Sequence, residues 1–349
     1  MSTVIGSLKF ERVHEDMAIS SLISAGVSGF DQGTTYEGIL GRGSEVIAPA
    51  SWEFIRGVLW NDDPACDFFN DFNSSNGDFQ AWAGRWWFNF RTPDTITYRS
   101  HHGDLQFLHA MASTVNEPPG ETQRKIMLWL EVMYKLSVGD GIYETDRIDS
   151  TGLSEFFNNA TTPRGSETLR GLLVGTTPQA WDTNIERRAL GSCFHVIQDS
   201  YAVGHCQRGL INPNNMVDVE YTNYWHSSLW FPWKEKIYIK GFTKENPGRF
   251  SSIKVFHCFD GQDHDKHEYY DSIPNGEKLD PSDPTSFYCI VGANDALDAC
   301  TTLATAWNSG WSWAEGGVSL KMKQTFELAS DSTTSDTKVD EYLWGLKRS

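Results

Sequence analysis

The chain has 349 residues, of which 39% are hydrophobic and 13% aromatic, and this composition excludes collagen-like and wholly disordered proteins. No apolar run approaches the roughly 18 residues that a membrane-spanning helix needs, so we expect no transmembrane segment. Acidic residues outnumber basic ones by 46 to 29, and the resulting net charge of −17 disfavours duplex nucleic acid as a partner and favours metal cations.

Four segments have the three- and four-residue apolar spacing of amphipathic helices: 14–25, 122–136, 184–201 and 294–307. Between them lie stretches rich in Gly, Asn, Pro and aromatic residues, at 26–50, 70–98 and 207–262, in which 236–240 alternates as a short strand would. Residues 329–340 are polar and low in complexity, which predicts a flexible link to a C-terminal tail. These patterns together favour an all-α fold with long loops.

Six cysteines are scattered along the chain without a CxxC pair. This spacing argues against a thiolate zinc site and against a thioredoxin-like redox centre, and it leaves disulfides and free buried thiols as alternatives. The N-terminal segment 1–13 lacks a basic region followed by an apolar run, so no secretory signal is visible. The protein is then intracellular, leaves the cell by another route, or is numbered from its processed form.

The clearest candidate for chemistry is the segment 194–205. His195 and Asp199 are four residues apart, so they share one face of the predicted helix, and Gly204 allows a turn that brings His205 back toward them. Apolar neighbours indicate that this face is buried. A buried aspartate beside a buried histidine is costly without a partner, and a metal ion supplies the missing charge. A His–Asp hydrogen bond in the core is the alternative interpretation.

Two weaker candidates lie before and after this segment. His264 and Glu268 are again four residues apart, although a charged surface helix would have the same pattern. His101 and His102 are adjacent, and either could be a ligand or part of an ordinary loop.

The segment 57–64 and the start of the first predicted helix supply two more candidates. Asp62 precedes Asp63 and Pro64, a pattern that also ends ordinary helices, and His14 lies near the N-terminus beside two acidic residues. Taken together, the candidates are imidazole and carboxylate groups without thiolates. Such donors favour zinc or a similar divalent ion in a hydrolytic site.

In this order the motifs resemble those of the zinc-dependent phospholipase C and P1/S1 nuclease superfamily. The matching features are the H-x3-D-x5-H spacing at 195–205, the H-x-K-x-E pattern at 264–268 with Asp-Ser-Ile after it, and the segments 57–62 and 100–101. The resemblance spans about 14–307 in islands. It implies an all-α, phospholipase C-like domain over 1–315, with an aromatic-rich insertion at about 207–262 and a short tail at 316–349.

The resemblance also implies a set of zinc ligands. Three groups follow from it: Asp62, His101 and His195 for one ion; His205, His264 and Glu268 for a second; and His14 for a third, with Asp199 bridging the first and the third. The chain begins with Met, whereas the N-terminal residue that chelates zinc in the family is usually Trp, so we expect two or three zinc ions per chain. Asp62 is in addition the expected general base.

Two features favour a lipid substrate within the superfamily. The H-x-K-x-E pattern is closer to the phospholipase branch, and Tyr98 takes the position at which that branch has an aromatic residue against choline. We therefore expect a secreted or exported, monomeric phospholipase C that acts peripherally at a membrane surface. It would cleave phosphatidylcholine-type phospholipids to diacylglycerol and a phosphorylated headgroup through a metal-activated water. The alternatives are a P1/S1-like single-strand nuclease and a non-catalytic module that binds metal or lipid.

Overall fold

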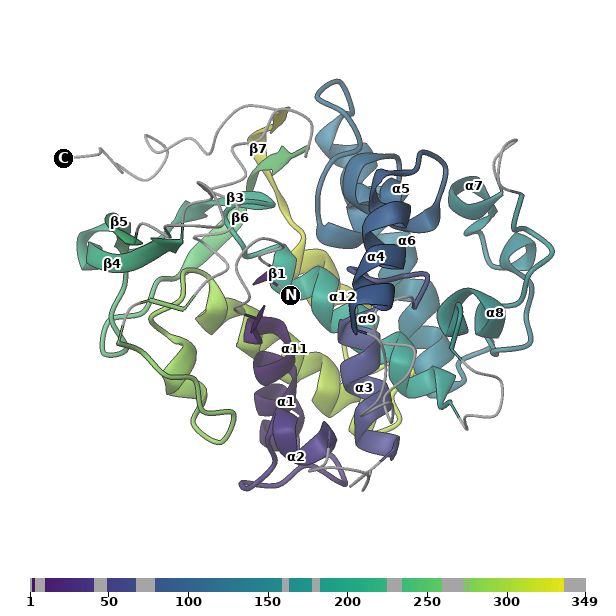
Figure 1. Cartoon of the computed structure of the whole chain (residues 1–349), viewed down its shortest axis with the longest axis horizontal. Helices are drawn as coiled ribbons and strands as arrows, with labels where there is room; N and C mark the ends of the chain where they lie inside the picture. The colour runs from purple at the N-terminus through teal and green to yellow at the C-terminus, as the bar shows by residue number, and fades with distance from the viewer. Residues whose placement is uncertain are drawn as a thin grey trace.

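The computed structural model describes residues 2–3, 10–40, 49–66, 79–158, 163–177, 183–224, 234–258, 273–274 and 276–335 (Figure 1). Four helices coincide with the segments expected from apolar periodicity: α1 (Val13–Ser24), α6 (Pro119–Val138), α9 (Ile185–Asp199) and α11 (Ala293–Asn308). These four predictions are confirmed. Sequence signals mark the ends of α6, which has Pro119 in its first turn and the left-handed Gly139 at its C-cap.

Further helices lie outside the four segments that the apolar spacing predicted. They are α2 (Tyr36–Leu40), α3 (Pro49–Val58), α4 (Phe79–Arg91), α5 (Ile96–His102), α7 (Ser154–Phe157), α8 (Leu169–Val174), α12 (Val318–Thr325) and the 3-10 turns η1 (Gln106–His109), η2 (Ile148–Ser150), η3 (Pro213–Asn215) and η4 (Pro284–Phe287). Residues 51–58 of helix α3 are all buried, Glu53 and Arg56 included, so the helix has no solvent-exposed face there. Among the described helices, none has the length and hydropathy that crossing a bilayer requires.

Helix α9 lies in the middle of the helical body and packs against α1, α3, α6 and α11. It begins where the Asn184 side chain accepts a hydrogen bond from the backbone N–H of Arg187. From Arg188 to Asp199 every residue is buried. The polar side chains in that run therefore need partners inside the protein.

The main hydrophobic core surrounds this central helix. Trp60 stacks on Trp129 of α6 with ring centroids 5.3 Å apart, and both side chains are fully buried. Met322 and Phe326, in and just after α12, belong to the same core. The first residues of the expected tail, 318–326, thus pack on the helical body. All six cysteines are buried free thiols, the second of the two alternatives left open by their spacing.

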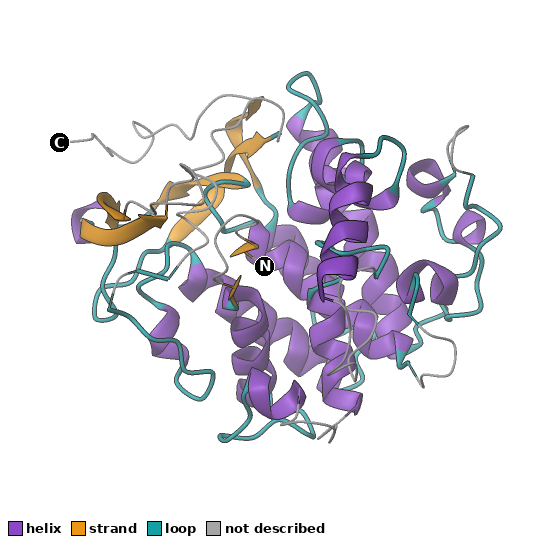
Figure 2. Cartoon of the chain, in the orientation of Figure 1, coloured by secondary structure: helices purple, strands orange, loops and turns teal. Residues whose placement is uncertain are grey.

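The expectation of an all-α fold is wrong, because the structure is a mixed α/β protein with a three-stranded mixed sheet on one side of the helices (Figure 2). In this sheet β6 (Phe250–His257) pairs antiparallel with β3 (Cys206–Leu210) and parallel with β7 (Leu328–Ser335). Apolar alternation did not reveal these strands, because β6 alternates irregularly and β7 is almost wholly polar. The flexible link expected from residue 329 is, up to residue 335, this strand.

Two smaller pairs complete the strands. Strands β4 (Val217–Tyr224) and β5 (Lys234–Gly241) form an antiparallel pair, and β1 (Ser2–Thr3) pairs with β2 (Phe10–Glu11). The strand expected at 236–240 is confirmed as the centre of β5.

Candidate metal centre

The last turn of α9 holds the central pair of the site. His195 and Asp199 are each 1% exposed, and His195 Nε2 lies 2.9 Å from Asp199 Oδ2. Asp199 is the last residue of the helix, two residues before the expected end, and the apolar residues around the pair bury both side chains. The surrounding histidines outweigh the opposing effect of burial and hold the pKa of Asp199 well below its ordinary value.

His205 returns to this pair from the turn between α9 and β3. Its Nδ1 lies 3.7 Å from Asp199 Oδ2, and the same nitrogen lies 2.9 Å from the backbone oxygen of His109. A carbonyl oxygen can only accept, so Nδ1 carries the proton and Nε2 keeps its lone pair. The expectation that His205 swings back toward His195 and Asp199 agrees with this geometry.

His14 reaches the centre from the first turn of α1. Its Nε2 lies 3.3 Å from Asp199 Oδ1, and its ring stacks on that of His195 with centroids 4.9 Å apart. The side chain is 7% exposed. An N-terminal histidine that was weak evidence in the sequence is therefore part of the buried cluster.

Asp62 follows α3 and faces the same histidine of α9. Its Oδ1 lies 4.0 Å from His195 Nε2, and its side chain is 13% exposed. Burial opposes ionisation, but nearby groups that include His195 and His109 lower the pKa of Asp62 below its ordinary value. The loop is fixed from two sides, since Trp86 Nε1 donates to the Asp62 backbone oxygen and Arg56 pairs with Asp63.

His101 lies at the edge of the cluster on α5. Its Nδ1 donates to the backbone oxygen of Thr97 at 2.8 Å, which leaves Nε2 with the lone pair. Burial and the neighbouring His109 lower the pKa of His101 to about 3, so the ring is neutral. The His101 and His109 ring centroids are 5.0 Å apart.

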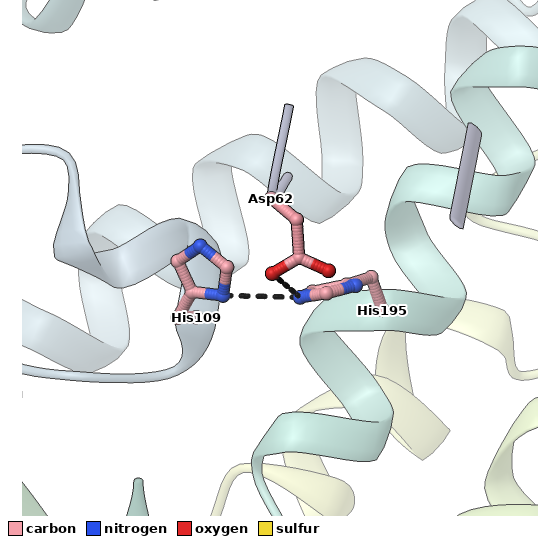
Figure 3. Close-up of side chains that lie close together, drawn as sticks. All are labelled: Asp62, His109 and His195. Atoms are coloured by element: carbon pink, nitrogen blue, oxygen red, sulfur yellow. Dashed lines mark hydrogen bonds and ion pairs between the residues drawn. The ribbon is translucent and has the colours of Figure 1, made fainter. Parts of the chain in front are cut away.

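His109 is the residue that sequence reasoning missed. It ends η1, is 5% exposed, and places Nδ1 2.9 Å from Asp199 Oδ2 and 3.0 Å from His195 Nε2. Figure 3 shows it beside Asp62 and His195. One signal could have found it: a single histidine inside the largely apolar run 105–111, where a buried imidazole needs a polar partner.

These side chains form two overlapping groups that share His109. Asp62, His109 and His195 make one, and His109, Asp199 and His205 make the other; within each group the possible ligand atoms lie within 4.8 Å of one another. The three closest atoms, on His109, His195 and Asp199, are 2.9–3.0 Å apart. Two ligands of a tetrahedral zinc ion with ~2.0 Å bonds would be separated by a similar ~3.3 Å.

The protons available to His109 favour a cation at this position. Its Nε2 lies 3.1 Å from the Asn61 backbone oxygen, while Nδ1 faces Asp199. Burial lowers the pKa of His109, and a neutral ring has one N–H for these two acceptors. Either tautomer thus leaves a lone pair against an oxygen. In addition, Asp199 Oδ1 receives no hydrogen bond from the described residues. These buried groups could hold a metal ion, which would relieve both defects.

The structure does not bring the other three expected residues into this centre as far as it describes them. His264 and Glu268 fall outside the described residues. Tyr98 is half-buried on α5, and its ring lies against His102 with centroids 5.2 Å apart. Of the nine residues expected in the site, six converge on the centre: His14, Asp62, His101, His195, Asp199 and His205.

Comparison of the chain with protein-family models, curated proteins and solved structures finds no match.

Proposed function

We propose that the protein is a zinc-dependent phosphodiester hydrolase, a phospholipase C that cleaves phosphatidylcholine-type phospholipids. The observation that supports it most directly is the sharing of His109 between two buried His/Asp groups, beside the ionised Asp62. A buried cation position with an ionised carboxylate at its edge suits the hydrolysis of a phosphodiester, whose negative charge grows in the transition state.

The donor set supports zinc as the metal. The groups offer nitrogen and carboxylate oxygen only, which suits zinc in hydrolytic sites. Backbone oxygens of Thr97, Asn61 and His109 lie within hydrogen-bonding distance of one ring nitrogen of His101, His109 and His205, respectively. Such outer contacts fix the tautomer of a histidine ligand and leave its other nitrogen for the metal.

Asp62 would act as the general base. Zinc, when bound, supplies Lewis acidity toward the phosphate oxygens and lowers the pKa of water toward ~7. Asp62 is ionised and mostly buried, so it can accept the proton of the attacking water. The water oxygen would bond to phosphorus, the bond from phosphorus to the glycerol oxygen would break, and that oxygen would take, through solvent, the proton that Asp62 accepted. The products are diacylglycerol and a phosphorylated headgroup.

Helix α4 supports a membrane surface as the location of the substrate. Its exposed face carries Phe88, 67% exposed, with Arg85 three residues before it and Arg91 three residues after it. The helix has no acidic residue, although the chain has a net charge of −17. An apolar tip between two cations suits the interface of a bilayer, and Trp86 ties this helix to the Asp62 loop.

A single-strand nuclease is the second candidate. Trp87 and Phe90 of α4 stack on each other beside His102 of α5, and aromatic faces also bind nucleic-acid bases.

Zinc-loaded protein should be incubated separately with labelled phosphatidylcholine vesicles and with labelled single-stranded DNA. We expect diacylglycerol release from the vesicles, abolished in Asp62→Asn. Cleavage of DNA alone would identify the nuclease, and metal uptake without turnover of either substrate would identify a non-catalytic module.

A further inference from the structure

Gln198, in the last turn of α9, forms two hydrogen bonds with His14. Its Oε1 lies 2.7 Å from His14 Nδ1, and its Nε2 donates to the His14 backbone oxygen at 3.2 Å. Gln198 is 3% exposed and His14 is 6% exposed, so both contacts are buried. The two hydrogen bonds join the first turn of α1 to the end of α9.

These two contacts determine where the His14 proton lies. The backbone oxygen of His14 can only accept, so the Gln198 NH₂ group must face it and the Gln198 oxygen must face the ring. An amide oxygen has no proton to donate, so His14 Nδ1 carries the proton. In the neutral ring, His14 Nε2 then holds the lone pair, 3.3 Å from Asp199 Oδ1.

The lone pair points at an oxygen that no described residue hydrogen-bonds. A nitrogen lone pair and a carboxylate oxygen repel each other unless a cation lies between them. His14 thus faces one carboxylate oxygen of Asp199, Oδ1, whereas His109 and His195 face the other, Oδ2. Both atoms are buried, so solvent screens the repulsion poorly.

We propose that Gln198 is a positioning residue that presets His14 as a metal ligand, because it fixes the ring proton on Nδ1 and directs Nε2 toward Asp199 Oδ1. This rests on the metal centre of the proposed function, and it adds a role for a residue that is not itself a ligand. Histidine ligands are commonly held this way by a partner on the second nitrogen, and loss of the partner weakens metal binding by about 10–100-fold.

Two variants separate positioning from mere packing. Gln198→Leu removes both contacts, whereas Gln198→Glu keeps an acceptor for Nδ1 and loses the donor to the backbone. Gln207→Leu is the matched control, since Gln207 is fully buried and its Oε1 lies 3.1 Å from Nε2 of His257, outside the two groups that share His109. Zinc affinity of the full chain is measured by competition with a chromophoric chelator. We expect one site to weaken about 10–100-fold in Gln198→Leu and to recover most of that loss in Gln198→Glu, with Gln207→Leu unchanged.

A second measurement needs neither a variant nor bound metal. In metal-free protein labelled with ¹⁵N-histidine, the ring resonances of His14 report its tautomer, and we expect the Nδ1–H form. The Nε2–H form in the wild-type chain would overturn the proposal, even where Gln198→Leu fails to fold. Equal zinc affinity in the wild type and Gln198→Leu, or equal losses in Gln198→Leu and Gln198→Glu, would also overturn it. Absence of lipid hydrolysis with these effects intact would instead refute only the proposed activity.

Discussion

Gly191 of α9 lies so close to Gly57 of α3 that a Cβ atom on Gly191 would fall 2.8 Å from the carbonyl carbon of Gly57 and 2.1 Å from the backbone oxygen of Phe54. In the same way, a Cβ on Gly57 would lie 2.1 Å from the Arg188 oxygen. The two helices can approach this closely only without side chains at these points. Their contact brings the Asp62 loop, which follows α3, to His195 on α9.

Gly57→Ala therefore tests whether this close approach supports the fold. We expect the free energy of unfolding to fall by about 1–3 kcal/mol, since backbone atoms must move to admit the methyl group. Gly84→Ala in α4 is the control, because a Cβ there would meet nothing within 4 Å, and it should be neutral or stabilising by up to about 1 kcal/mol. Denaturant unfolding measures both. Equal changes in the free energy of unfolding of the two variants would show that the close approach of α3 and α9 does not contribute to stability.

His109→Ala tests the residue that both metal groups share. We expect zinc affinity to drop by at least about 10–100-fold, because each group loses a ligand. His102→Ala is a suitable control. His102 of α5 packs against Phe90 of α4 and Tyr98 of α5, and it belongs to neither group of possible metal ligands. Isothermal titration with zinc compares them. Zinc binding by His109→Ala at wild-type affinity would show that the shared position is not a ligand.

The His195–Asp199 pair was predictable because its partners lie one helical turn apart, and the apolar residues around them indicate burial. His109 was not predictable in that way. Its partners lie far away in sequence, and its nearest neighbours are mostly apolar, so no local spacing marks it. Tertiary packing of η1 against the end of α9 creates this contact.

The strands show the same limit. In β6 the buried Ile253, Val255 and Phe256 do not alternate regularly, and β7 contributes mainly backbone pairing. A polar segment such as 328–335 becomes a strand only because β6 offers it an edge. Four helices were recognised from their local apolar periodicity, whereas α3 and the strands of the three-stranded sheet were missed.

Metal removal should lower the stability of the protein. Without a cation, the lone pair of a neutral His14 faces Asp199 Oδ1, and that of a neutral His109 faces either Asp199 Oδ2 or the Asn61 backbone oxygen. We expect a chelator to lower the melting temperature and added zinc to restore it. The gain would be ~2.7 kcal/mol when free zinc is 100 times the dissociation constant. A melting temperature that is indifferent to chelator and zinc would argue against metal binding.

Asp16, in the first turn of α1, gives a prediction about the pH dependence of stability. Burial, followed by the nearby Glu15, raises the pKa of Asp16 to about 7. The folded state therefore holds this proton more tightly than the unfolded state, and the stability contributed by Asp16 falls as pH rises from about 4 to about 7. Asp16→Asn should raise the free energy of unfolding at pH 8 and change it little at pH 4. An equal effect at both pH values would contradict the raised pKa.

Phe88→Asp tests the membrane surface proposed for α4. We expect binding to phosphatidylcholine vesicles to weaken about tenfold or more, because burying a Phe side chain contributes ~1.5–3 kcal/mol. Leu320→Asp is the matched control, as Leu320 is 59% exposed on α12. Vesicle co-sedimentation measures both, and hydrolysis of a water-soluble phosphodiester should remain unchanged in each. Equal loss of vesicle binding in the two variants would remove α4 as the docking face.

The most direct test of whether the buried His/Asp groups bind zinc is the zinc content of the purified full chain. It is measured by elemental analysis after gentle purification and equilibration with zinc. Binding of two or three zinc ions per chain would agree with imidazole and carboxylate groups that converge on shared cation positions. A well-folded chain that retains no zinc would contradict the metal centre and the hydrolase built on it.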